Sequence, residues 1–321
     1  NMHLGFITSL AKQGAFPPEY SIAPGNKLCY PFLCDSISAS VYLFGASLRY
    51  AYMLPMYFAV LQVFAGFYLL AYSWLRKAAK ACLAWFLFFY NGGLAFVYFI
   101  DWSKDRAYTL SSIFTEYYQT PTNLIDNNIR WVNVIVDMLL PQRATLFGYA
   151  VLFTCILLLG RAVFREEKEL FLPAALLTGA LPMIHTHSFL AMALVSASWL
   201  LMTLCRQLSI GQALKAPGKI VLPAFLLLMC CLQFVSKKKA SVDLALFFNI
   251  CVIGLAALTC FGLWCLVLYI RKNGWRTLLP TWGLYLALTL ILSLPQLFTW
   301  TFVQASSGGF NKGHFNWANL G

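Results

Sequence analysis

Long apolar runs separated by short polar or basic segments dominate the pattern of this chain. A run of about 20 apolar residues is long enough to cross the hydrocarbon core of a membrane as a helix. The pattern therefore predicts an all-α, multi-pass transmembrane helical bundle. We expect about eight crossings, near residues 48–75, 81–100, 144–163, 171–184, 188–205, 220–235, 243–270 and 277–300.

Three longer polar segments interrupt these runs, and we expect all three on the outer face of a single transmembrane domain that covers 1–321. The first, 1–47, predicts a loop with a short helix near its start. Its half-polar stretch 31–45 predicts a juxtamembrane helix that lies along the membrane surface. The second, 101–143, has the aromatic content of the headgroup region and predicts an amphipathic or re-entrant loop. The third is 301–321.

The stretch 127–143 places charged and amide groups in an otherwise apolar segment. Read as a helix, Arg130, Asn133 and Asp137 form one polar stripe, and Arg143 lies at the predicted membrane boundary. Charges at that depth cost roughly 2.5–3.5 kcal/mol each, so the set is a candidate functional site. The alternative is a structural Arg–Asp clamp that holds a loop onto the bundle.

Composition agrees with a membrane protein. The chain is 60% hydrophobic and 11% charged, with a mean hydropathy of +0.71, whereas about a quarter of a soluble domain is charged. The formal charge of +12 does not indicate a nucleic-acid partner, because lysine and arginine form small clusters and no continuous basic face. Membrane lipids are the expected surroundings. Most of the ten cysteines lie in apolar runs, and a disulfide between Cys29 and Cys34 is an alternative to free thiols.

Basic residues crowd into the short turns at 76–80, 161–169, 206–219 and 271–276. Since short basic loops mark the cytoplasmic side of a membrane protein, the long polar segments are expected to face outward. Lys237 departs from this pattern together with the two lysines that follow it. The prediction is a multi-pass protein of the cell (plasma) membrane with its site facing outside.

Under this topology all four histidines fall on the outer face, with several other polar residues. The candidate catalytic residues, which can exchange a proton with a substrate, are Asp35, Asp137, His185 and His187. The candidate substrate-binding residues are His3, Tyr30, Arg130, Asn133, Gln142, Arg143, His314, Asn316 and Trp317. Each histidine also has an ordinary interpretation as a hydrogen-bonded residue of a loop or helix end.

A divalent cation would use both His185 and His187 only if the chain is extended there, because positions i and i+2 of a helix diverge by about 200°. Further ligands would have to come from Asp35, Asp137 or His314, and the spacing establishes no metal site. The HExxH, Walker A, GxSxG and paired CxxC patterns are missing from the sequence, so the familiar soluble chemistries have no support.

The residues Phe16-Pro17-Pro18, Gly25 and Tyr30-Pro31-Phe32 precede the half-polar helix, and Gly45, Arg49 and a crossing that ends in Arg and Lys follow it. This layout resembles the first external loop and second helix of GT-C class glycosyltransferases. That class includes protein O-mannosyltransferases, oligosaccharyltransferases and aminoarabinose transferases.

The resemblance implies a polyprenyl-phosphate-linked sugar as donor and an active site at the outer membrane face. It also implies an acidic residue in the first external loop that acts as general base. That acid would precede Asn1, and Asp35, which lies past the Tyr30-Pro31 element, is the alternative within the sequence. Because the sequence opens at Asn1 without an initiator methionine and stops within a polar aromatic segment at Gly321, we expect an internal piece of a longer protein, truncated at both ends.

The chemistry of such a transfer matches the residue types. A leaving phosphate needs cations, and Arg130 or Arg143 would hold it with two parallel hydrogen bonds. A carboxylate or histidine would take the proton of the acceptor hydroxyl. A polytopic transporter or a lipid or glycolipid flippase would use similar residues along broken helices and is the main alternative, and a non-catalytic scaffold is another.

Overall fold

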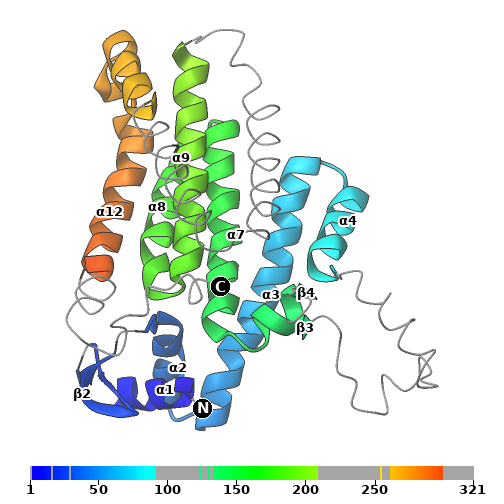
Figure 1. Cartoon of the computed structure of the whole chain (residues 1–321), viewed down its shortest axis with the longest axis vertical. Coiled ribbons are helices and arrows are strands. Elements are labelled where there is room, and N and C mark those ends of the chain that lie inside the picture. The colour runs from blue at the N-terminus through cyan, green and yellow to red at the C-terminus, as the bar shows by residue number, and fades with distance from the viewer. Residues whose placement is uncertain are drawn as a thin grey trace.

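The computed structural model describes residues 2–15, 17–28, 30–91, 123–124, 129–130, 133–208, 254 and 261–298. This part of the chain is mostly helical, which confirms the predicted fold class in its coarse form. Figure 1 shows long helices side by side, with a smaller layer at one end. Two short antiparallel pairs join β1 (Glu19–Tyr20) to β2 (Ala23–Lys27) and β3 (Asn123–Leu124) to β4 (Ile129–Arg130).

Within the described ranges, three helices are long and apolar enough to cross a membrane. They are α3 (Leu48–Leu75), α7 (Arg143–Phe164) and α9 (Thr186–Leu208). The first two match the predicted crossings within one residue at each end. The shortest of the three has 22 residues, or about 33 Å, which is slightly more than the roughly 30 Å thickness of a hydrocarbon core.

The larger count of about eight crossings stays a prediction. Two of the expected crossings, 220–235 and most of 243–270, lie outside the described residues. The expected crossing at 81–100 is described only as far as residue 91, where α4 (Ala78–Phe89) has already ended.

Shorter helical segments complete the bundle. They are α8 (Phe171–Ala180), residues 261–273 and α12 (Leu284–Gln296). Short 3₁₀ or π segments adjoin them: η2 (Val134–Leu139), η3 (Lys168–Leu170), η4 (Leu181–Met183), η6 (Trp275–Thr277) and η7 (Leu279–Gly283). Pro182 lies in η4, the 3₁₀ turn that separates α8 from α9.

Two apolar clusters hold the helices together. One joins α7 to α8, α9 and α12 and includes Leu159 and Tyr285, both almost fully buried. The other joins α3, α4 and α7 and includes Val63 and Phe89. Because α7 contributes to both clusters, it is the central helix of the described bundle. Its packing therefore fixes the position of Arg143, its first residue.

A small layer covers the end of the bundle at which α3, α7 and α9 begin (Figure 1). It consists of α1 (Met2–Lys12), the β1–β2 pair and α2 (Leu33–Leu43). The predicted short helix near the start of the chain is therefore confirmed. At 11 residues, or about 16 Å, α2 covers only half of a hydrocarbon core and is too short to cross it. Its expected position along the membrane surface stays a prediction.

The helix predicted over 127–143 is wrong in its described part. Arg130 lies in a β-strand, and the helical segment is the short π-helix η2 alone. It begins after Asn133 because that side chain accepts hydrogen bonds from two N–H groups of the first turn. Asp137 in turn accepts one from the N–H of Asn133 at 2.7 Å. The expected helical stripe therefore does not form.

Candidate functional site

A buried ion pair joins the end layer to the bundle. Nε of Arg143, the first residue of α7, donates to Oδ1 of Asp35 in α2 at 3.0 Å. The two side chains are 1% and 0% exposed. A charge removed from water at this depth is tolerated only with a partner of opposite sign and further hydrogen bonds, and this pair has both.

The guanidinium of Arg143 donates three further hydrogen bonds to protein groups. It donates to the carbonyl of Tyr52 at 3.0 Å, to the hydroxyl of Ser38 at 2.6 Å and to the carbonyl of Cys34 at 3.4 Å. Cζ of Arg143 also lies 4.6 Å from the centre of the Tyr52 ring. Arg143 thereby connects α2, α3 and α7, a structural role that adds to any chemical one.

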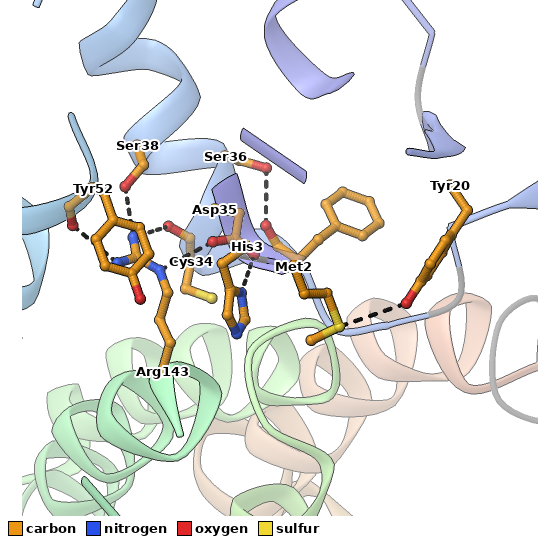
Figure 2. A network of polar contacts seen from close by, with 10 residues as sticks. Met2, His3, Tyr20, Cys34, Asp35, Ser36, Ser38, Tyr52 and Arg143 are labelled. Atoms are coloured by element: carbon orange, nitrogen blue, oxygen red, sulfur yellow. Dashed lines mark hydrogen bonds and ion pairs between the residues drawn. The ribbon is translucent and has the colours of Figure 1, made fainter. Parts of the chain in front are cut away.

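The second oxygen of Asp35 faces a histidine. Nδ1 of His3 lies 2.9 Å from Oδ2, and the imidazole is 15% exposed. Figure 2 shows Asp35 between His3 and Arg143. Because a carboxylate only accepts hydrogen bonds, Nδ1 of His3 is the donor, and in the neutral tautomer that makes this bond the lone pair is on Nε2. Among the described residues, none is hydrogen-bonded to that Nε2. A base oriented by a buried carboxylate is the arrangement that general-base catalysis needs.

Aromatic and sulfur groups surround the pair and stay uncharged. The rings of Phe6 and Tyr30 each lie 5.7 Å from the imidazole of His3. Burial, with Cys34 and Asp35 nearby, raises the pKa of Tyr30 to about 12. Burial and the Asp35 carboxylate raise the pKa of the Cys34 thiol to about 12. Cys34 is a free thiol, and neither group is a nucleophile at neutral pH.

A second cluster lies at the start of α9. Nδ1 of His185 is 2.8 Å from the hydroxyl of Ser188, and Nε2 is 3.3 Å from that of Thr145 in α7. Thr145 also donates to Oε1 of Gln142 at 2.8 Å. Burial lowers the pKa of His185 to about 4, with a smaller contribution from the neighbouring His187. At neutral pH it is therefore an uncharged hydrogen-bonding group.

Close packing positions this histidine. The 3₁₀ turn η4 ends with the N–H of His185 bonded to the carbonyl of Leu181 at 2.7 Å. The imidazole then lies over Gly148 of α7, where an added Cβ would be 2.4 Å from Cβ of His185. Only glycine leaves room at that position. The two imidazoles of His185 and His187 are 5.2 Å apart between ring centres.

The two clusters lie at the same end of the bundle. Met183, two residues before His185, packs in one apolar cluster with Phe6 and Phe32 of the end layer. On the other side, Thr145 and Arg143 are two residues apart at the start of α7. The structure thus gathers seven of the predicted site residues here: His3, Tyr30, Asp35, Gln142, Arg143, His185 and His187.

Two other predicted site residues belong to a different group. Asn133 donates to the carbonyls of Phe89 and Asn91, which ties η2 to the end of α4. Asp137 is exposed and bonds back to Asn133. No interaction within the described residues joins Asp137 to Arg143. The side chain of Arg130 and the residues His314, Asn316 and Trp317 lie outside the described residues.

Sequence reasoning missed three residues of these networks: Ser38, Thr145 and Ser188. Only Ser38 carried a usable signal, because it lies one helical turn after Asp35 in a half-polar helix. Within the described ranges, no three His, Cys, Asp or Glu side chains are grouped as metal ligands would be. Comparisons of the chain with models of protein families, with curated proteins and with solved structures found no match.

Proposed function

We propose that this chain is a membrane glycosyltransferase that moves a sugar from a polyprenyl-phosphate donor to an acceptor hydroxyl at the extracytoplasmic face. The observation that carries the proposal is the buried carboxylate of Asp35, which lies between the imidazole of His3 and the guanidinium of Arg143. The resemblance of the first 76 residues to GT-C enzymes supports the same reaction.

In the proposed reaction His3 is the general base. The acceptor oxygen bonds to the anomeric carbon while the bond from that carbon to the phosphate oxygen breaks. The electron pair leaves with the polyprenyl phosphate, and the acceptor proton moves to Nε2 of His3. Asp35 stabilises the imidazolium that results, at 2.9 Å from its Nδ1.

Arg143 acts in this scheme as a positioning residue. Four hydrogen bonds, to Asp35, Ser38 and two backbone carbonyls, hold its guanidinium, so it orients the carboxylate and compensates its charge. The donor phosphate would meet the N-terminal ends of α7 and α9, whose N–H groups favour an anion. His185 would donate or accept a hydrogen bond as an uncharged group.

The proposed orientation rests on the opposite end of the bundle. The turns there carry Arg76, Lys77, Lys80, Arg161, Arg165, Lys168, Arg206, Arg271, Lys272 and Arg276. Such a concentration of basic residues in short turns favours the cytoplasmic side. The end that holds His3 and Asp35 would then face outward, where polyprenyl-linked sugars are used by the enzymes that the chain resembles.

A row of buried hydroxyls favours a second candidate function, transport of a polar substrate. The hydroxyl of Tyr285 in α12 lies 2.7 Å from that of Ser196 in α9 and 3.2 Å from that of Thr178 in α8. Further along α12, the hydroxyl of Ser293 is buried without a hydrogen-bond partner in the described part of the chain. Polar groups within a bundle are typical of substrate pathways.

Sugar transfer by the full-length protein in nanodiscs, with polyprenyl-phosphate-linked sugars as donors, tests the proposal. We expect His3→Gln and Asp35→Asn each to slow transfer by about 100-fold or more, the usual contribution of a general base. Lys12→Gln, an exposed change on the same helix as His3, is the matched control and should transfer normally. Normal transfer by His3→Gln contradicts the mechanism. Absence of transfer by the wild type with every donor favours the transporter.

A further inference from the structure

A second polar site lies at the opposite end of the bundle, where α3 and α7 end side by side. A cavity of about 300 Å³ opens there. The residues that line it are Ser73, Trp74, Arg76, Gly160, Arg161, Phe164 and Arg165. Three of the seven are arginines and none is acidic, so the cavity has the charge of an anion-binding site.

Among the ion pairs of the described residues, none compensates the positive charge of two of the three arginines. Arg161 donates from both Nε and a terminal nitrogen to the carboxylate of Glu167, which neutralises it. Arg165 donates to the carbonyl of Ser73 at 3.2 Å, which leaves its charge uncompensated. Neither Arg165 nor Arg76 takes part in any of the ion pairs found among the described residues. Both are exposed.

Aromatic rings form the apolar side of the cavity. The rings of Trp74 and Phe164 are 5.7 Å apart, and each packs on Trp199 of α9. Gly160 allows this packing, since a Cβ there would lie 3.3 Å from the Trp199 ring. Trp74 and Phe164 remain 55% and 44% exposed. Tryptophan and arginine together at the end of spanning helices are typical of the headgroup level of a membrane.

Helix capping and topology explain part of this arrangement. Arg76 caps α3 in the left-handed region (φ 56°), and Arg165 caps α7. Cations at helix C-termini offset the negative end of the dipole, and basic turns orient the chain. Neither role requires a cavity, however, or an arrangement in which three arginines line it while the nearby Glu166 and Glu169 do not.

We propose that this cavity binds the phosphate of an anionic ligand, with a phospholipid headgroup as the occupant that the location favours. Arg76 and Arg165 would hold the phosphate oxygens by charge-assisted hydrogen bonds. Trp74 and Phe164 would border the start of the acyl chains. Basic pockets between helices at this depth recognise anionic lipids by the same chemistry. The inference is independent of the reaction proposed above, since it uses the other end of the molecule.

The test compares phosphatidylglycerol with phosphatidylcholine on the full chain in detergent, by native mass spectrometry and by the thermal midpoint. We expect the wild type to retain phosphatidylglycerol preferentially and to be stabilised by it. Arg76→Asn and Arg165→Gln should each weaken this binding roughly fivefold, from the attraction of one basic side chain to an anionic headgroup. Asparagine is chosen because it tolerates the left-handed backbone at position 76.

Arg271→Gln is the matched control, because Arg271 is an exposed arginine at the same end that does not line the cavity. Equal retention of the two lipids by the wild type rejects a lipid as the occupant, and together with no stabilisation by inorganic phosphate it overturns the proposal, as does an equal loss in Arg271→Gln. A third arm adds inorganic phosphate without lipid. Stabilisation by phosphate alone that Arg76→Asn removes supports the phosphate site and assigns it to a soluble ester. Stabilisation by phosphatidylglycerol alone supports it and assigns it to a lipid.

Discussion

Arg143 is the largest fully buried side chain in the described part of the chain, and it carries a full charge. Its hydrogen bonds reach α2, α3 and, through Asp35, the imidazole of α1. Removal of one member of a buried ion pair leaves the other charge without compensation, which usually costs about 3–5 kcal/mol. At the scale of single residues, this contact holds the end layer on the bundle.

We therefore expect Arg143→Gln to lower the free energy of unfolding by about 3–5 kcal/mol, and Arg143→Lys to recover only part of the loss, because an ammonium cannot reproduce the guanidinium fork. Thermal midpoints in detergent provide the measurement. Arg49→Gln, a change of an exposed arginine on α3, is the control and should stay within about 0.5 kcal/mol. Similar midpoints for Arg143→Gln and Arg49→Gln would contradict this role.

His185 makes stability depend on pH. Its pKa of about 4 in the folded state lies below the usual 6.5, because burial disfavours the charged imidazole. Between these two values the unfolded chain binds more protons than the folded chain, so stability falls as the pH drops from 6.5 towards 4. We expect a loss on the order of 2 kcal/mol, and His185→Gln should flatten that part of the pH profile of the thermal midpoint. An unchanged slope in His185→Gln would rule out this residue as the cause.

At the scale of elements, α7 packs closely against His185, which joins the turn η4 to α9. An alanine at position 148 would place its Cβ 2.4 Å from Cβ of His185, so the segment between η4 and α9 would have to move. Gly148→Ala should therefore destabilise the protein by about 1–3 kcal/mol. Gly66→Ala in α3 is the matched change, since its Cβ would make an ordinary 3.6 Å contact with Phe153. Equal thermal midpoints for Gly148→Ala and Gly66→Ala would contradict this prediction, because the segment around His185 would then move without cost.

The sequence predicted elements well where length and hydrophobicity decide them. α3 and α7 begin and end within one residue of the predicted crossings, because an uninterrupted apolar run has few alternatives in lipid. The segment 127–143 was predicted wrongly because local hydrogen bonds decide it. The pairing of β3 with β4 and the cap of Asn133 end the regular pattern that the stripe assumed.

The site shows the same division between local and distant information. Sequence reasoning named His3, Asp35 and Arg143, but it grouped Arg143 with Arg130 and Asp137. The partner of Arg143 is Asp35, 108 residues away, and only the packing of α2 on α7 brings them together. A single sequence shows residue types and local spacing, whereas such a pair depends on the fold of the whole bundle.

At the scale of the whole molecule, the polar site and the basic turns lie at opposite ends of the spanning helices (Figure 1). We expect Lys12→Cys to react with a membrane-impermeant maleimide on intact cells, and Lys272→Cys to react only after permeabilisation. The wild-type chain measures the background from native cysteines such as the exposed Cys82. Labelling of both variants on intact cells would contradict the proposed orientation.

The central claim is that His3, held by Asp35, takes the proton of an acceptor hydroxyl. Chemical rescue tests it most directly, because a small base in solution replaces a catalytic imidazole but not a structural one. We predict that His3→Ala transfers sugar about 100-fold or more slowly than the wild type, and that added imidazole restores a measurable part of the rate in His3→Ala while leaving Asp35→Asn slow. Wild-type transfer by His3→Ala, or a slow rate that imidazole does not raise, would contradict the account.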